Sequence, residues 1–361
     1  MNKSHVYSSL KILHDLDRIK QIREGKIVPP KTVRIDLNTI CNHGCSFCLY
    51  QSSSDGLKGV GFNGEMPLGA QIDDKRLIKL IKEFKECGVN SLVFLGGGEP
   101  TIHPNLEGII EAVNDSGLEY GIITNGSRLD RIIPYKNFPG FKWVRVSLDA
   151  AKERTWMKIH QPSGAMKYGF KHILDAVKDL KNGRPDFLRG MSFIVGKENY
   201  QEIYDFIELG RRLGIDNVRI GLEYGKGFGE RNSGIMPSSM EQVKRGKIDF
   251  ETEDFTIFDR MSGRKKDVSS ERDYSTCGFM GLSTNLGADL NLYTCCFGKY
   301  TNSHKIGSLK EMSFKELWFN YRKKFLERFD VSKCPPCWYG ETNRILEYVT
   351  QKDAPHSNFI D

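Results

Sequence analysis

Three cysteines, Cys41, Cys45 and Cys48, lie within the eight-residue segment CNHGCSFC. Three thiolates on one short loop that includes Gly44 can surround a single metal centre. An iron–sulfur cube held by three cysteines leaves one iron without a protein ligand, and an open coordination position is typical of a catalytic metal site. The alternative is a zinc ion with His43 as fourth ligand. However, His43 lies between two of the ligands, and reaching the same ion would strain the loop.

A second group of cysteines lies near the C-terminus, at Cys277, Cys295, Cys296, Cys334 and Cys337. Two short strands around a Gly-Ala-Asp turn predict a β-hairpin that brings Cys277 and Cys295 together. Ser313 and Glu316 then form a capping box that opens a helix to about Leu326. That helix returns the chain to the C-x-x-C pair of the segment CPPC. Four thiolates gathered in this way fit either a zinc ribbon or an iron–sulfur cluster.

A regular alternation of strands and helices precedes this group. After a helix over 8–23, the pattern predicts strands at 32–37, 91–95, 119–124, 142–148, 188–195 and 217–222, and helices at 73–87, 105–115, 165–181 and 200–213. Such alternation indicates a parallel sheet with right-handed crossovers. Six units are too few for a closed eight-stranded barrel. The predicted fold class is therefore α/β, a partial (β/α)6 barrel with a small C-terminal domain of a hairpin and a helix.

The unusual segments of the sequence fall where such a fold places its ligands, directly after strands. The cysteine loop follows the first strand, GGGEP (96–100) the second, TNG (124–126) the third and SLDA (147–150) the fourth. We therefore expect these four segments to lie on one rim of the barrel.

Four regions are expected along the chain. They are an N-terminal helical extension (1–30), the partial barrel (31–224), a linker or substrate-facing segment (225–276) and the cysteine-containing domain (277–361). The segment 224–234 is rich in glycine and polar residues, which is typical of a loop. Residues 236–275 are charged and weakly patterned, and no fold is predicted for them.

The whole chain has 361 residues, of which 39% are hydrophobic and 27% are charged. Its net charge of +7 is spread along the chain, and no basic stripe with interleaved aromatic residues indicates nucleic-acid binding. No segment reaches the ~20 apolar residues that span a bilayer, and the N-terminus lacks the apolar core of a secretory signal. We therefore expect a cytoplasmic location without a membrane partner. Nine cysteines then indicate metal or redox chemistry rather than disulfides.

The segments CNHGCSFC and GGGEP together resemble the radical S-adenosylmethionine (radical SAM) superfamily, in order and spacing, over about residues 32 to 224. The resemblance implies that the three cysteines hold a 4Fe–4S cube whose fourth iron is chelated by SAM. It also implies cofactor contacts at Phe47 (adenine), at Gly96, Gly97, Gly98, Glu99 and Pro100 (methionine ammonium), at Asn125 and Ser147 (ribose or carboxylate), and at Val195 and Leu222 (adenine). Helix capping remains the alternative role for Asn125 and Ser147. Core packing remains the alternative for Val195 and Leu222.

The C-terminal cysteines resemble the twitch or SPASM-type extensions of the same superfamily, which hold auxiliary 4Fe–4S clusters. Full SPASM extensions use more cysteines, so the shorter one-cluster twitch form fits this chain better. The implied ligands are Cys277, Cys295, Cys334 and Cys337. Two cysteines remain. Cys87, at a helix end, is predicted to pack as an apolar residue. Cys296 could replace Cys295 as a ligand, donate a hydrogen atom or be buried.

The resemblance implies an enzyme in which a 5′-deoxyadenosyl radical, made from SAM, removes a hydrogen atom from a substrate C–H bond. An auxiliary cluster with four cysteine ligands would serve to accept an electron. The favoured reaction is therefore net oxidation of a small sugar- or cyclitol-like substrate, with flavodoxin or ferredoxin as reductant. The candidate catalytic residues are Cys296 and Glu223, which follows the sixth strand at the barrel mouth.

Two other functions stay open. The first is modification of a ribosomal peptide by crosslinking or epimerisation, for which Cys296 would suit as a hydrogen donor. The second is a non-catalytic zinc or iron–sulfur regulatory protein, which would have no need of GGGEP at a strand end.

Overall fold

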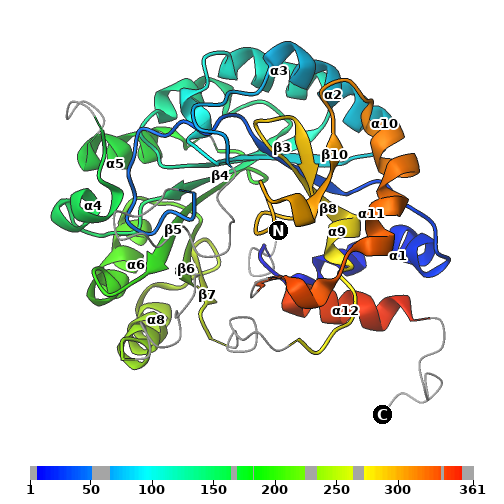
Figure 1. The fold of residues 1–361 in the computed structure, drawn as a ribbon. Helices are drawn as coiled ribbons and strands as arrows, with labels where there is room; N and C mark the ends of the chain where they lie inside the picture. Colours follow the sequence, from blue (N-terminus) through cyan, green and yellow to red (C-terminus); the bar gives the residue numbers. More distant parts are fainter. Residues whose placement is uncertain are drawn as a thin grey trace.

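The computed structural model describes residues 6–50, 66–163, 169–181, 183–223, 234–262, 272–334 and 337–351. Its strands form a single curved, open sheet in the order β10-β9-β8-β1-β2-β3-β4-β5-β6-β7 (Figure 1). The strands are β1 (Thr32–Asp36), β2 (Ser91–Leu95), β3 (Glu119–Thr124), β4 (Phe141–Ser147), β5 (Leu188–Val195), β6 (Asn217–Leu222), β7 (Thr256–Arg260), β8 (Ser283–Leu286), β9 (Asn291–Tyr293) and β10 (Lys305–Ser308). Strands β1 to β7 are parallel, which confirms the predicted partial barrel.

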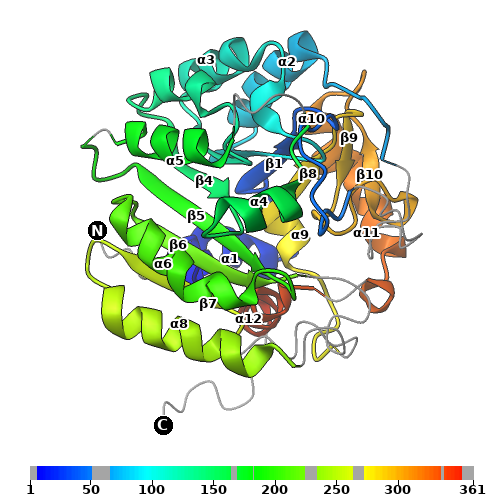
Figure 2. The same ribbon diagram turned by 90° about the vertical axis from the view of Figure 1, so that its left-hand side faces the viewer.

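Helices cover the convex side of the sheet, with α2, α3, α5, α6 and α8 forming an outer arc (Figures 1 and 2). The α-helices are α1 (Leu16–Arg23), α2 (Asp74–Glu86), α3 (Leu106–Ser116), α4 (Glu153–His160), α5 (Phe170–Asp179), α6 (Ile203–Arg212), α8 (Met236–Phe250), α9 (Phe279–Leu282), α10 (Phe314–Glu316), α11 (Arg322–Arg328) and α12 (Gly340–Thr350). The main hydrophobic core lies between these helices and the sheet. In α2, for example, Leu77, Ile81 and Phe84 recur at helical spacing and are fully buried.

Three elements differ from the expectations. The predicted helix over 8–23 is interrupted, because the side chain of Asp15 accepts a hydrogen bond from Arg18 N and starts α1 afresh after a 3-10 turn. Helix α4 was not predicted. The segment 225–276, expected as a linker, contains α8 and the seventh parallel strand, β7. The buried face of α8 includes the small residues Ser239 and Gly246, so large apolar residues do not mark its periodicity. The loop predicted at 224–234 lies, except for its last residue, outside the described residues.

The predicted C-terminal hairpin forms between β8 and β9 and continues the barrel sheet. Strand β8 pairs in parallel with β1, from Thr32 opposite Ser283 to Ile35 opposite Leu286, and β9 pairs antiparallel with β8. The predicted helix follows, because Ser313 Oγ accepts a hydrogen bond from the N–H of Glu316. It runs through a π-helical turn into α11. The cysteine-containing extension is therefore hydrogen-bonded to the first strand of the barrel.

A buried ion pair fixes the same junction. Lys299 is 0% exposed, and its Nζ lies 2.6 Å from both carboxylate oxygens of Asp36 on β1. The hydroxyl of Tyr300 donates to the same carboxylate at 2.7 Å. The Lys299 ammonium also faces the ring of Tyr50, two residues beyond the cysteine loop, with 4.7 Å to the centroid. Burial raises the pKa of Asp36, while the ammonium and these hydrogen bonds favour the charged form.

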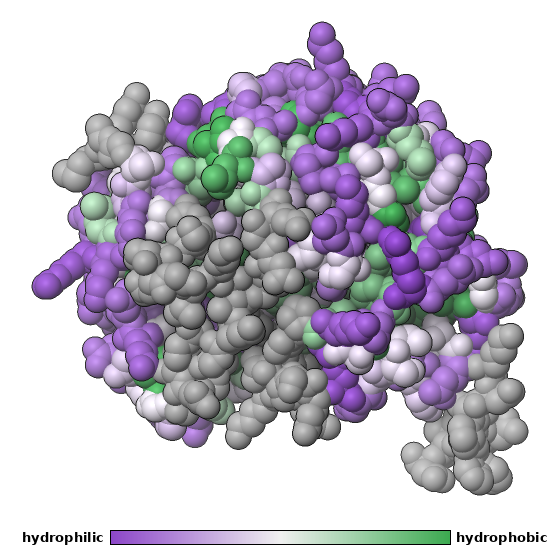
Figure 3. Space-filling view, in the orientation of Figure 1, coloured by the Kyte–Doolittle hydropathy of each residue, from purple (hydrophilic) through white to green (hydrophobic). Residues whose placement is uncertain are grey.

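Hydrophilic residues cover most of the outer rim that is visible in Figure 3, in agreement with the even spread of charge along the sequence. Within the part of the chain that the structure describes, the helices are too short or too polar to cross a bilayer.

The ion pair leads to a stability prediction. Lys299→Met is expected to lower the free energy of unfolding by about 3–5 kcal/mol, because it leaves the Asp36 carboxylate buried without its cation. Adding Asp36→Leu should recover part of this loss, since both charges are then removed. Lys323→Met, at an exposed position, serves as the control in urea unfolding. A single Lys299 variant as stable as the control would contradict the assigned role.

Candidate functional site

The cysteine loop is held by the C-terminal end of α4. The N–H of Gly44 donates to the carbonyls of His160 and Gln161, and the N–H of Ser46 donates to the carbonyl of Ile159. The last carbonyls of an α-helix have no partner within the helix, so the loop satisfies acceptors that would otherwise face water. The side chain of Ser163 adds a bond to the carbonyl of Asn42. The loop that carries the three thiols is thus fixed by its backbone.

The three thiols lie within electrostatic range of one another. Burial raises the pKa of Cys41 to about 12 and that of Cys45 further, and Cys48 adds to both shifts. Buried thiols of this kind become thiolates when a metal binds them. Cys45 Sγ also lies 3.3 Å from Nδ1 of His160, a residue on α4 that the sequence did not single out.

A single zinc ion fits this loop less well than a cluster. Among the described residues, one group brings its ligand atoms within 4.8 Å of one another: His43, Cys45 and His160. Cys41 and Cys48 lie outside that group. The three thiols and His43 are therefore not gathered as closely as the Cys₃His zinc site considered from the sequence requires. A cube makes a looser demand on the thiols, because each cysteine binds a different iron.

The glycines of GGGEP are required by close backbone contacts. A Cβ on Gly98 would lie 1.9 Å from the carbonyl oxygen of Ile40, and a Cβ on Gly96 would lie 1.5 Å from the carbonyl oxygen of Gly98. The N–H of Gly98 donates to Asn38 O, and the N–H of Glu99 donates to Ile40 O. The backbone of this strand end is therefore packed directly against the start of the cysteine loop, and Pro100 begins the buried 3-10 turn that follows.

Glu99 is fully engaged within the fold. Its carboxylate accepts hydrogen bonds from the N–H and hydroxyl of Thr101, the hydroxyl of Thr124 and the N–H of Asn125. The amide of Asn125 in turn donates to Asn42 on the cysteine loop. Both side chains were predicted to contact the cofactor, and the structure uses both to join β2, β3 and the cysteine loop. The carbonyls of Gly96, Gly97 and Gly98 remain the candidates for the methionine ammonium.

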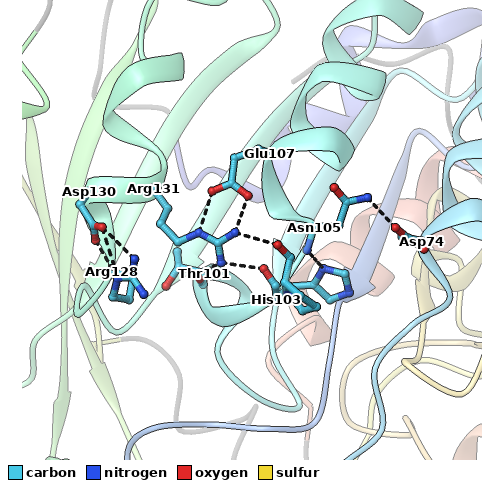
Figure 4. Close-up of polar contacts among 9 residues, drawn as sticks. Asp74, Thr101, His103, Asn105, Glu107, Arg128, Asp130 and Arg131 are labelled. Carbon is cyan, nitrogen blue, oxygen red and sulfur yellow. Dashed lines mark hydrogen bonds and ion pairs between the residues drawn. The ribbon is translucent and has the colours of Figure 1, made fainter.

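An arginine clamp immobilises the segment after GGGEP (Figure 4). The guanidinium of Arg131 donates to the carbonyls of Thr101, His103 and Pro104 and forms an ion pair with Glu107. Asn105 meanwhile donates to Asp74 on α2 at 2.5 Å. The loop therefore cannot move independently of α2 and α3.

A cavity of about 200 Å³ opens beside the cysteine loop. It is lined by Phe47 together with Ile194, Gly196 and Glu223, so two residues predicted from distant parts of the sequence come together here. Ser147, the last residue of β4, lies 3.4 Å from Ser192 through its hydroxyl.

Two residues that were predicted to contact the cofactor have side chains that do not face this cavity. Val195 and Leu222 belong to the hydrophobic core beneath the helices and do not line this cavity. Because strand side chains alternate between the two faces, their neighbours Ile194 and Glu223 face the cavity instead. The core-packing role considered from the sequence is the one that the structure supports for both residues.

The C-terminal thiols form a second group. Cys277, Cys295, Cys334 and Cys337 lie within electrostatic range of one another, and burial raises the pKa of Cys334 to about 11 and that of Cys337 to about 12. Two further contacts surround them. The N–H of Tyr339 donates to Cys337 Sγ at 3.3 Å, and Nε2 of His304 lies 3.5 Å from Cys334 Sγ. The hairpin and the C-x-x-C segment therefore meet.

The two remaining cysteines have different surroundings. Cys87 caps the end of α2 and packs partly buried against the core, as expected. Cys296 is 7% exposed and lies 3.5 Å from the hydroxyl of Tyr339. Its neighbour Cys295 is within electrostatic range of Cys277 and Cys337, and Cys296 is within range of Cys337, so both cysteines lie at the second thiol group.

Several known proteins are similar to this chain in sequence. The sequence profile of the Radical SAM superfamily matches residues 35–223. Probable GTP 3′,8-cyclase of Saccharolobus islandicus is 27% identical over 193 residues, which are 53% of this chain and 56% of that protein. The chain thus spans little more than half the length of these cyclases. AdoMet-dependent heme synthase of Methanosarcina barkeri is 24% identical over 328 residues, 86% of this chain and 89% of that protein.

Solved structures share the fold. Streptococcus suis SuiB bound to S-adenosylmethionine superposes with a TM-score of 0.61 at 14% identity, over 83% of this chain and 68% of that chain. Histidine-tagged anSMEcpe with bound AdoMet superposes with a TM-score of 0.56 at 17% identity, over 90% of this chain and 92% of that chain. At these identities the likeness concerns the fold.

The two thiol groups predict how iron is distributed. In anaerobically reconstituted protein, replacing Cys334 and Cys337 together by Ala is expected to remove the auxiliary cluster and thus about half of the bound iron. In a separate variant, Cys41→Ala is expected to remove the first cluster, which holds the other half. Cys87→Ala, which changes a partly buried cysteine outside both groups, should leave the iron content unchanged. Iron and zinc per chain are measured by elemental analysis. Full iron in the Cys334/Cys337 variant, or zinc in the wild-type protein, would contradict the second cluster.

Proposed function

The chain belongs to the radical SAM superfamily, and on that premise we propose that it oxidises a small sugar- or cyclitol-like substrate after abstraction of a hydrogen atom. The family implies a 4Fe–4S cluster and SAM, and the residues around the cysteine loop fit both. Three partly buried thiols lie within electrostatic range of one another, and the glycine backbone beside them has no room for side chains. The cavity at Phe47 adjoins them.

In this proposal Cys41, Cys45 and Cys48 hold the cluster, and the carbonyls of Gly96 to Gly98 accept the methionine ammonium. When bound, cluster and SAM would supply the radical chemistry that abstracts a hydrogen atom from the substrate. The protein positions the reactants and excludes water. Phe47 offers an aromatic face for the adenine, and Ser147 offers a hydroxyl at the end of β4. These residues remain proposals for contact with the cofactor.

We further propose that Cys277, Cys295, Cys334 and Cys337 hold an auxiliary 4Fe–4S cluster. Because cysteines would fill all its protein-ligand positions, the second cluster would serve as an electron acceptor. The proposal of net oxidation is supported mainly by the position of Arg34. This residue lies on β1, the first strand of the barrel, and its guanidinium is within electrostatic range of Cys295 and Cys296. The second thiol group thus adjoins the barrel wall, a suitable position to receive an electron from a substrate radical.

A second candidate function is modification of a ribosomal peptide. It is favoured by the buried thiol of Cys296, which interacts with Arg34 at the barrel wall and would suit as a hydrogen donor. One structural neighbour is SuiB bound to the precursor peptide SuiA, with a TM-score of 0.59 at 13% identity. The proposed redox partner in either case is a small reductant such as flavodoxin or ferredoxin. Glu223, on the cavity wall, is the proposed catalytic or substrate-orienting carboxylate.

The release of 5′-deoxyadenosine distinguishes these functions. The reduced, reconstituted protein is expected to release 5′-deoxyadenosine faster when a small-molecule fraction of a cell extract is added, and Cys41→Ala should abolish the release. Stimulation by the peptide fraction alone would favour peptide modification. No release with either fraction would overturn the enzymatic proposal and favour a regulatory protein.

A further inference from the structure

Arginines occupy the concave face of the barrel on four strands: Arg34 on β1, Arg145 on β4, Arg219 on β6 and Arg260 on β7. The residues on either side of Arg145, Val144 and Val146, belong to the core beneath the helices. Because side chains alternate along a strand, each arginine points to the opposite face, toward the barrel interior. Arg145 is partly exposed even though its strand is central in the sheet, so solvent reaches this interior face.

The guanidinium of Arg145 takes part in no hydrogen bond or ion pair among the described residues. Its buried Nε has no hydrogen-bond partner among the described residues, and the same holds for Nε of Arg34. Structural arginines in this protein behave differently. Arg131, for example, uses its guanidinium on backbone carbonyls and Glu107. A buried donor without a partner is costly, and an anionic oxygen is the acceptor that compensates a guanidinium best.

A glycine separates Arg145 from a second unpaired polar group. Arg145 pairs in register with Gly190 on β5, which pairs with Asn217 on β6. The side chain of Asn217 lies over Gly190, since a Cβ there would be 2.7 Å from its Oδ1. This Oδ1 is buried and has no hydrogen-bond partner among the described residues. A cationic donor on β4 and a neutral acceptor on β6 therefore flank β5, and the residue between them in the register, Gly190, has no side chain.

Other charged groups share this face, and one of them is the Glu223 carboxylate on the cavity wall. Asp36, the carboxylate on the same face of β1, is paired with Lys299. The ring of Tyr7 lies 5.7 Å from the guanidinium of Arg219, and its carbonyl accepts a hydrogen bond from Arg260. The N-terminal segment thus occupies the arginines of β6 and β7. Arg34 faces Tyr339, Cys295 and Cys296, which leaves Arg145 as the arginine of this face without such a contact among the described residues.

We propose that the substrate carries an anionic group, a carboxylate or a phosphate, which Arg145 binds on the concave face, beside a hydroxyl that donates to Asn217. Arg34 reinforces the positive potential from the other side of the barrel. This inference rests on the proposed function and narrows its substrate from a neutral polyol to a sugar acid or sugar phosphate. Arg145 and Asn217 are then binding residues that fix the substrate below the cofactor rim.

Equilibrium binding tests the inference without turnover. In calorimetry with reconstituted protein and SAM, gluconate or glucose 6-phosphate is expected to bind, and neutral myo-inositol is expected to bind at least tenfold more weakly, roughly the contribution of one charge-assisted hydrogen bond. Arg145→Gln should weaken binding about tenfold or more, and Arg145→Lys should restore part of it. Arg212→Gln, at an exposed position on α6, is the matched control. Failure of both anions to bind, or equal binding by Arg145→Gln, would overturn the inference.

A second measurement separates this inference from the proposed function. The extract component that stimulates 5′-deoxyadenosine release is passed over an anion exchanger at neutral pH. Retention supports an anionic substrate, and recovery in the flow-through overturns it. If no fraction stimulates release, the proposed reaction fails, while the calorimetric result still decides whether Arg145 binds anions.

Discussion

The pairing of Asp36 with Lys299 is the contact through which the cofactor side and the cysteine-containing extension depend on each other. Asp36 lies at the end of β1, where the cysteine loop begins, and it also accepts a hydrogen bond from the N–H of Gly97. Lys299 comes from the segment after the hairpin, close to Cys296. Bringing two charges out of water is unfavourable unless each remains paired, so the extension cannot leave the barrel without exposing or orphaning both. The pair therefore sets the mutual position of the two thiol groups.

Backbone hydrogen bonds and close packing also fix the position of the cysteine loop. The cysteine loop hydrogen-bonds to carbonyls at the end of α4 on one side and packs against the glycines of GGGEP on the other. Glu99 accepts two hydrogen bonds that connect the end of β2 with the end of β3, and two more from Thr101 in its own turn. Such fixed geometry matters for radical chemistry, because the substrate hydrogen has to meet the reactive carbon before other groups do. The surrounding fold thus fixes the backbone that carries the thiols.

Much of this arrangement follows from the sequence, and the exceptions have physical reasons. Strands such as Ser91–Leu95 were predicted to the residue, and the motifs at strand ends meet because parallel strands share one rim. Helix α8 escaped prediction because small residues form part of its buried face. The burial of Lys299 could not be predicted from the sequence, since a single lysine outside a regular element resembles any surface lysine. The engagement of Glu99 depends on Thr124 and Asn125, whose approach only the folded sheet reveals.

The two faces of the sheet have different roles. Residues on the face under the helices stabilise the fold, and residues on the inward face give the interior its chemical specificity. On β4, Val144 and Val146 bury their side chains under the helices, while Arg145 and Ser147 between and beyond them face inward. Unpaired groups such as Arg145 Nε and Asn217 Oδ1 are then unfavourable only locally, and the helix-covered core supplies the stability that tolerates them. Substrate specificity can therefore reside in the inward positions of the strands, while the rim segments keep the chemistry constant.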